Sequence, residues 1–235
     1  GNEMAGTTAV TGTGTVTGRA GTITVGGTVS VTTLTGGGGA IDIDGSATGT
    51  DFTESNTTTA VGGDLTVTNF TANGGTITFD TTAGSTVNGY TFNDVVVSAN
   101  TTMGGNWTVG GSLDVDATLD TNGNDLGVTT NVTGTGTVTG GAGTITVGGE
   151  VSVGTLSGGS GAIDIDGSAT GGTLTESSTT TAVGGDLTVT TFTANGGTIT
   201  FDTTAGSTVN GYTFNEVVVS ANTTMGGNWT VGGSL

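Results

Sequence analysis

Short runs in which apolar residues alternate with Thr, Ser or Asp recur along the whole chain. Successive side chains of an extended strand point to opposite faces, so each run predicts a short strand with one apolar face. No apolar i, i+3, i+4, i+7 pattern of useful length occurs, and we therefore predict no helix. The apolar pairs are Ile23 with Val25, Ile41 with Ile43, Leu65 with Val67, Ile77 with Phe79, and Trp107 with Val109.

Pairs of glycines separate these runs and predict the corners between strands. Glycine has no Cβ and takes positive φ without a clash, so it turns the chain readily. The chain contains no proline, which would remove backbone N–H donors from a strand ladder. The pairs are Gly26 with Gly27, Gly62 with Gly63, Gly74 with Gly75, and Gly104 with Gly105.

The chain contains two copies of one long repeat, offset by 122 residues. Residues 71–93, for example, are identical to residues 193–215. The alignment assigns residues 1–113 to the first repeat, which begins in mid-phase, and residues 123–235 to the second. Residues 114–122 have no counterpart, and we predict that they connect the repeats within one continuous structure.

A shorter period lies inside the long one. The phrase hydrophobic-Gly-Gly-x-hydrophobic-Thr/Ser-Val occurs at residues 25–31, 61–67 and 103–109. Six turns per repeat give roughly 20 residues per turn, a spacing typical of stacked repeat architectures. We predict an all-β fold, a parallel β-solenoid (β-helix), in which Val, Ile and Leu form a narrow core. Its large core side chains are Phe79, Tyr90, Phe92 and Trp107.

The composition narrows the classes of partner. The chain has one basic residue, Arg19, against 19 Asp and Glu, and a net charge of -18. Binding phosphate requires clustered Lys and Arg, so we expect no nucleic-acid partner. No apolar run approaches the roughly 20 residues that span a bilayer, so we expect no membrane insertion. The strict alternation of apolar and polar residues argues against disorder.

The inventory of catalytic groups is nearly empty, and we expect this protein not to be an enzyme. It contains no His, Cys or Lys. Paired carboxylates are the remaining option, since two carboxyl groups can cleave a glycosidic bond. The best pair is Asp42 with Asp44, repeated as Asp164 with Asp166. Strand alternation already explains both pairs as the outer face opposite the Ile residues.

Residues 120–125 resemble a calcium loop because oxygen-bearing side chains alternate there. The loop departs from the EF-hand pattern, since Gly is fourth and no bidentate Glu follows in place. A plain Asn/Gly turn explains the same residues. We therefore expect no cofactor, with diffuse calcium binding by the acidic chain as the alternative.

Thr-x-Thr pairs offer another surface. Thr22 with Thr24, Thr66 with Thr68, and Thr76 with Thr78 would form a flat array, as on ice-binding solenoids, if they lay in register. These pairs do not recur at one fixed spacing, which a lattice match would require. We interpret them as ordinary outward positions of strands.

Two phrases carry a resemblance to known proteins: GNWTVGGSL at residues 105–113 and LDTNGNDL at residues 119–126. Their style resembles the repeats of large prokaryotic surface proteins, the β-solenoid adhesins and autotransporter-passenger-like stalks. The resemblance covers most of the chain. It implies export, a cell-surface or extracellular location, and a stalk or adhesive role.

We expect an extracellular structural fibre or filament subunit that assembles head to tail with copies of itself. Solenoid ends expose unpaired strand edges, and a head-to-tail contact that does not close makes a filament. The alternatives are a stalk segment of a larger cell-surface adhesin and an ice- or glycan-binding solenoid. The edges expected to meet carry Asn2, Met4 and Val10 at one end, and Trp229, Val231 and Leu235 at the other.

Overall fold

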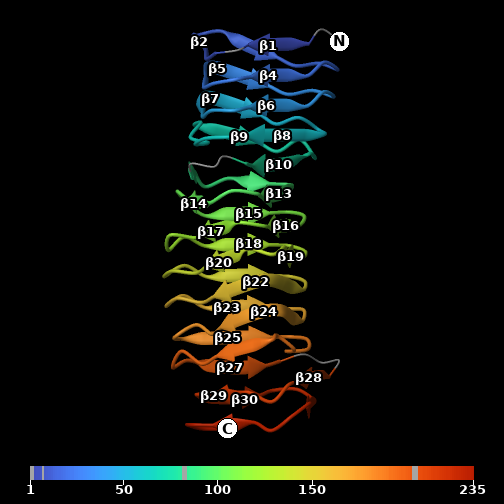
Figure 1. Ribbon diagram of the computed structural model, residues 1–235, viewed down its shortest axis with the longest axis vertical. Helices are drawn as coiled ribbons and strands as arrows, with labels where there is room; N and C mark the ends of the chain where they lie inside the picture. Colours follow the sequence, from blue (N-terminus) through green and yellow to red (C-terminus); the bar gives the residue numbers. More distant parts are fainter. Residues whose placement is uncertain (1–2, 7, 81–83, 203–205) are drawn as a thin grey trace. The chain divides into compact units, whose positions relative to one another are not determined.

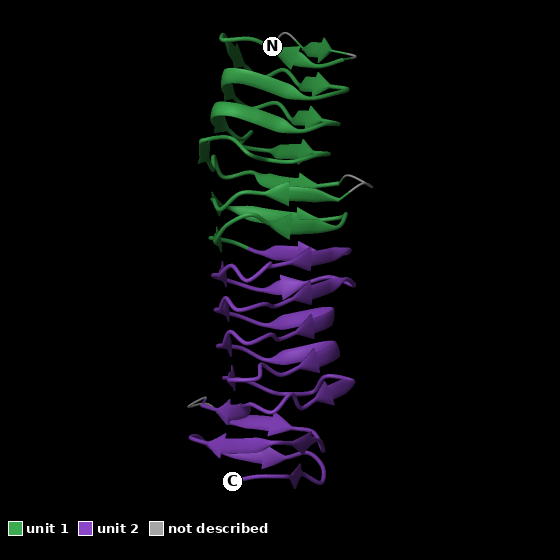
Figure 2. Ribbon diagram, turned by 90° about the vertical axis from the view of Figure 1, so that its left-hand side faces the viewer, with its two compact units in different colours: residues 1–111 green, residues 112–235 purple. Residues whose placement is uncertain are grey.

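The structure is a computed structural model that describes residues 3–6, 8–80, 84–202 and 206–235. It divides into two compact units, unit 1 (residues 1–111) and unit 2 (residues 112–235), coloured separately in Figure 2. In each unit the described residues form short strands that stack coil upon coil in parallel ladders (Figure 1), and none of them is helical. The predicted parallel β-solenoid is confirmed.

The described residues of unit 1 form fifteen strands, most of them three or four residues long. They are β1 (Met4–Gly6), β2 (Val10–Thr11), β3 (Thr15–Thr17), β4 (Ile23–Val25), β5 (Val29–Thr35), β6 (Ile41–Ile43), β7 (Ala47–Thr53), β8 (Thr58–Val61), β9 (Asn69–Thr71), β10 (Thr76–Phe79), β11 (Ser85–Val87), β12 (Thr91–Phe92), β13 (Asp94–Val97), β14 (Thr101–Met103) and β15 (Trp107–Val109).

In the part of unit 2 that the structure describes there are seventeen strands, which repeat the same order after two strands of its own, β16 and β17. They are β16 (Leu113–Val115), β17 (Thr118–Asp120), β18 (Leu126–Val128), β19 (Val132–Thr133), β20 (Thr137–Thr139), β21 (Ile145–Val147), β22 (Val151–Ser157), β23 (Ile163–Ile165), β24 (Ala169–Thr175), β25 (Thr180–Val183), β26 (Thr191–Thr193), β27 (Thr198–Phe201), β28 (Ser207–Val209), β29 (Thr213–Phe214), β30 (Glu216–Val219), β31 (Thr223–Met225) and β32 (Thr230–Val231).

Most neighbouring coils are offset by 18 residues, close to the roughly 20 that the sequence predicts. In unit 1, Ile23 pairs with Ile41 and Ile77 pairs with Val95. The offset widens to 22 residues between Leu65 and Val87 and narrows to 16 between Ser85 and Thr101. These uneven coils explain why the turn boundaries are hard to place from sequence.

The predicted core is confirmed except at Tyr90, which is only half-buried because its hydroxyl donates to the carbonyl of Val67 at the surface of the coil. All ten residues of the apolar pairs are buried, including Ile23, Leu65 and Trp107. Large aromatic side chains fill part of unit 1, where the Phe92 ring lies 5.1 Å from both Phe70 and Trp107. Backbone amides bridge one coil to the next, and rows of aliphatic side chains are sealed between them, so stability is shared among neighbouring coils.

The glycine pairs lie at corners as predicted, but the predicted reason holds for only one of their eight members. Among them only Gly74 has a positive φ, 81°. At Gly62 a Cβ would fall on the carbonyl oxygen of Asp44 in the preceding coil, and at Gly63 it would meet Ser46. These two glycines are needed because adjacent coils approach closely there, not because the chain bends.

One repeat does not contain a whole number of turns. In unit 2, Leu113 and Met225 lie on one side of the coil, six turns apart. Leu235 is the counterpart of Leu113, yet it lies on another side of the coil. The carbonyl of the preceding residue, Ser234, accepts a hydrogen bond from the N–H of Val217, which belongs to that other side. The 122 residues therefore cover six and two-thirds turns, about 18.3 residues each, instead of six. The steps between Leu113 and Met225 are Val132, Val151, Ala169, Leu187 and Val209.

Candidate functional site

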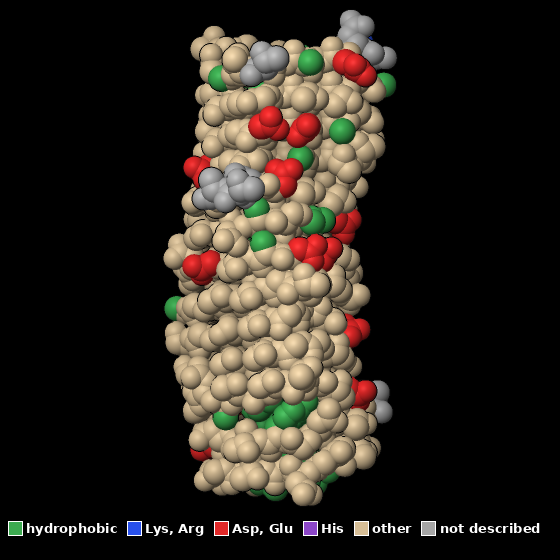
Figure 3. Space-filling model, in the orientation of Figure 1, with side chains coloured by type: hydrophobic (Ala, Val, Ile, Leu, Met, Phe, Trp, Pro, Cys, Tyr) green, Lys and Arg blue, Asp and Glu red, His purple; other side chains and the backbone are tan. Residues whose placement is uncertain are grey.

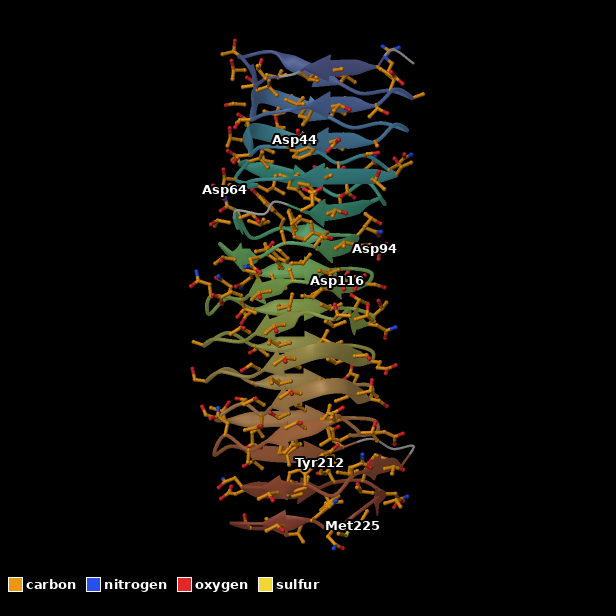
Figure 4. All side chains as sticks on the ribbon, viewed as in Figure 1. Asp44, Asp64, Asp94, Asp116, Tyr212 and Met225 are labelled. Atoms are coloured by element: carbon orange, nitrogen blue, oxygen red, sulfur yellow. The ribbon has the colours of Figure 1, made fainter. Side chains whose placement is uncertain are left out.

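The last coil of unit 2 leaves large apolar side chains exposed. Val219 is 45%, Met225 57% and Leu235 81% exposed, and Val218 is exposed as well. Val219, Met225 and Leu235 also line a shallow open pocket together with Thr223 and Trp229. Figure 4 shows Met225 on this coil. We call this surface the C-terminal face, defined by Val219, Thr223, Met225, Trp229 and Leu235.

The same side chains are buried in the first repeat. Val97, Met103 and Leu113, the counterparts of Val219, Met225 and Leu235, have no exposed surface. The identical sequence therefore forms a sealed core where the chain continues.

Each residue predicted for the C-terminal edge is found at this end of unit 2. The Trp229 Nε1 donates a hydrogen bond to the carbonyl of Val209 at 3.3 Å, which holds the half-buried ring in place. Val231 pairs with Phe214. The sequence analysis did not include Val219 and Met225, because the repeat marks them only as copies of core residues.

The predicted N-terminal edge belongs to unit 1. Met4 in β1 pairs with Ile23, and Val10 in β2 pairs with Val29. Both side chains are half-buried, although their sequence pattern is that of core residues. Asn2 lies outside the described residues. The predicted meeting of this edge with the C-terminal face stays a prediction.

Threonines line one side of unit 2 in two columns, which corrects the expectation that Thr-x-Thr pairs lack a fixed spacing. The pairs named in the sequence analysis do not form them, but other pairs stack at 18-residue intervals. All eight side chains of the columns are at least partly exposed, and none is charged. The columns are Thr137, Thr155, Thr173 and Thr191, and beside them Thr139, Ser157, Thr175 and Thr193. We call them the threonine face.

The candidate carboxylate pairs lie on the outer faces of their strands, as alternation predicts. Asp42 and Asp44 flank the buried Ile43, and Asp164 and Asp166 flank Ile165. Partial burial, with the nearby charges of Asp166 and Asp202, raises the pKa of Asp164. Figure 3 shows carboxylates singly and in small groups on a surface that is mostly uncharged.

The calcium-like loop is a turn. The Asp120 Oδ1 accepts a hydrogen bond from the N–H of Asn122 at 2.8 Å, and Asn122 and Gly123 both have positive φ. Across residues 3–6, 8–80, 84–202 and 206–235, no three acidic side chains come close enough to hold a metal ion.

Two buried glutamates were missed by the sequence analysis. Glu54 and its counterpart Glu176 have no exposed surface. The Glu54 Oε1 accepts hydrogen bonds from the N–H groups of Asn73 at 2.9 Å and Gly75 at 3.2 Å. Burial raises the pKa of both carboxyl groups, and the backbone hydrogen bonds oppose this rise in part.

Comparison with known proteins adds no relative: no family model, no curated protein and no solved structure matches this chain. The parallel β-solenoid and its tandem repeat therefore rest on the sequence and the structure themselves. Nowhere in the described ranges does the chain form a helix long and apolar enough to cross a membrane.

Proposed function

We propose that this protein is a structural, self-stacking solenoid that forms extracellular fibres through head-to-tail contact of its coil ends. The observation that carries this proposal is the C-terminal face, whose side chains are exposed while their counterparts in the first repeat are buried. Removing such side chains from water is favourable, and the edge strands offer backbone groups to a further coil. The N-terminal coil of a second copy is the proposed partner.

The proposed fibre is favoured over catalysis by what the outer surface carries. The chain has no His, Cys or Lys, and its candidate carboxylates lie on ordinary strand faces. A head-to-tail contact that does not close on itself extends into a filament. A stalk of a cell-surface adhesin would use the same contact between repeats of one polypeptide, and we retain the resemblance to prokaryotic surface proteins as support for the extracellular location.

Replacing Met225 by glutamate is expected to weaken assembly about tenfold or more, because association would bury a charge without a partner. Sedimentation velocity over a range of concentrations, with negative-stain electron microscopy, measures this. Thr224→Glu is the matched control, since Thr224 is the exposed neighbour on the same strand. Unchanged assembly of the Met225→Glu variant, or a parent protein that stays monomeric at all concentrations, would contradict the proposal.

A second candidate function is ice binding, and the threonine face favours it. Adjacent coils are about 4.8 Å apart and alternate residues of a strand about 6.7 Å, so the two columns present hydroxyl and methyl groups on a regular grid. The face has no charged side chain to disturb an ordered water layer. This regularity holds over four coils of unit 2.

Thermal hysteresis tests this second function. We expect the parent protein to depress the freezing point below the melting point, and the double replacement Thr155→Lys and Thr173→Lys to remove most of that effect. The control is Thr146→Lys, an exposed position in β21 on another side of the coil. A parent protein without hysteresis, or equal activity in both variants, would exclude ice binding by this face.

A further inference from the structure

We propose that the edge formed by β2 and β3 is completed by a segment with the sequence of residues 113–120. The head-to-tail joint of the fibre would then contain a copy of residues 114–122, DVDATLDTN. The inference rests on the proposed function for its role in assembly, but the match between edge and segment is argued from equivalent strands in the two units.

The evidence is that unit 2 contains the same two strands with their complement in place. β19 and β20 have the same sequences as β2 and β3, Val-Thr and Thr-Val-Thr. In unit 2, β16 pairs with β19 and β17 pairs with β20. On the opposite edge both β19 and β20 pair with β22, as β2 and β3 pair with β5. Among the described residues, β2 and β3 have only that one partner strand.

The complement also buries the side chains that the edge leaves open. Val132 and Val138 in β19 and β20 are 2% and 1% exposed. Their counterparts Val10 and Val16 in β2 and β3 are only half-buried. This difference in burial comes from β16 and β17, which cover β19 and β20 in unit 2. Leu119 in β17 is itself fully buried. The edge of unit 1 therefore lacks the apolar layer that residues 113–120 supply in unit 2.

Specific hydrogen bonds accompany this packing. The carbonyl of Val115 accepts from the N–H of Gly136 at 2.7 Å. The Asp116 Oδ1 accepts from the N–H of Thr135 at 3.2 Å and from its hydroxyl at 3.1 Å. Figure 4 shows Asp116 in unit 2. Thr13 is the counterpart of Thr135, so the edge of unit 1 carries the donors that this carboxylate accepts from.

The C-terminal face reaches the start of the same segment. Leu235 is the counterpart of Leu113, the first residue of the complement. A neighbouring copy thus carries the first residue of the complement at Leu235, and the proposed segment supplies the part that corresponds to residues 114–120. When a strand is added to an open edge, main-chain hydrogen bonds give affinity and the alternate side chains give specificity. The proposed occupant is this acidic, alternating segment.

The test compares the parent protein with two variants extended at the C-terminus. One carries DVDATLDTN, and the other carries VDDATDLTN, in which Val and Leu are each shifted by one position to the outer face. Sedimentation velocity measures assembly, and hydrogen exchange measures the amides of residues 10–17. We expect the native extension to assemble at about tenfold lower concentration, which corresponds to ~1.4 kcal/mol, and to protect residues 10–17.

The outcomes separate this inference from the proposed function. If the parent protein or the shifted extension assembles as well as the native extension, the inference is overturned and the fibre stands. If no variant assembles, the fibre proposal fails, and a second pair of variants, extended at the N-terminus, decides the inference. In one of these variants the sequence of residues 112–122 precedes Gly1, and in the other its shifted version does. Protection of residues 10–17 by the native sequence alone upholds the complement, and equal exchange in both overturns it.

Discussion

Replacing Phe92 by alanine is expected to lower the free energy of unfolding by about 3–5 kcal/mol, the usual cost of removing a large aromatic side chain from a packed core. Phe92 is 1% exposed. Its ring centroid lies 5.1 Å from those of Phe70 and Trp107, 6.0 Å from Tyr90 and 6.1 Å from Phe79. The cavity would therefore remove one member from several aromatic pairs at once.

Tryptophan fluorescence during denaturant unfolding measures this locally. The Trp229→Phe background leaves Trp107 as reporter of the first repeat, and Trp107→Phe leaves Trp229 as reporter of the second. Thr91→Ala is the control, since Thr91 is the exposed neighbour on β12 and its replacement should cost less than about 0.5 kcal/mol.

Phe214→Ala provides a second comparison. Phe214 has the same ring neighbours in the second repeat, but its partner Trp229 is only half-buried, so we expect a smaller cost than for Phe92. Equal losses at the two sites would show that burial of the tryptophan does not set the stability of the cluster. A loss below about 1 kcal/mol at Phe92 would contradict the packing argument itself.

The sequence predicts the strand faces well because a strand has a period of two that no tertiary contact alters. Ile41 and Ile43 point inward and Asp42 and Asp44 outward for that reason alone. The burial of Trp107 follows in the same way. The repeat adds the order of the elements, since each identical segment must meet an equivalent local environment.

Contacts between coils could not be predicted in this way. Gly62 has a role only because the Asp44 carbonyl of the neighbouring coil lies where a Cβ would be. Glu54 breaks the rule that acidic residues point outward. The N–H groups that donate to its carboxylate, those of Asn73 and Gly75, come from the next coil. Both features depend on the register between coils, which uneven turn lengths hide in the sequence.

The fractional number of turns matters for any continuous array that keeps the register of unit 2. There, residues one repeat apart lie on different sides, as Leu113 and Leu235 do. Three repeats would restore the phase after 20 turns. A face such as the threonine face would then return to the same side only at every third repeat. In such a fibre, copies of each face would point in different directions around the axis. This arrangement suits a structural role better than binding to one flat surface.

The two buried glutamates are expected to make the protein more stable in acid than at neutral pH. Burial raises the pKa of Glu54 above its ordinary value of 4.5, the hydrogen bonds from Asn73 and Gly75 lower it in part, and the charge of Asp94 raises it further. The folded state thus binds the proton more tightly than the unfolded chain. This contribution to stability is fully present below pH 4.5 and is lost as the pH rises through the raised pKa of the folded state.

The geometry explains why the pKa is raised. The Glu54 Oε1 accepts two backbone hydrogen bonds, while the Oε2 is buried and has no hydrogen-bond partner among the described residues. The Oε2 of Glu176 is in the same situation. A buried carboxylate oxygen without a partner is costly when charged, so neutralisation by a proton is the cheaper state.

Two replacements at Glu54 separate charge from hydrogen bonding. Glu54→Gln, with Glu176→Gln, keeps an acceptor for the backbone N–H groups but cannot ionise, so we expect stability near that of the parent in acid and higher at pH 8. Glu54→Ala leaves the buried N–H of Gly75 without its acceptor and should cost about 1–3 kcal/mol at every pH, plus the cavity.

Denaturant unfolding from pH 3 to pH 9 measures both effects. The outer carboxylates also repel one another as the pH rises, since the net charge is -18, so the parent protein alone does not prove the point. The comparison that decides is the difference between the parent and the double Gln variant. A difference that does not change with pH would mean that these glutamates titrate alike in the folded and unfolded states, and that their burial carries no pH dependence.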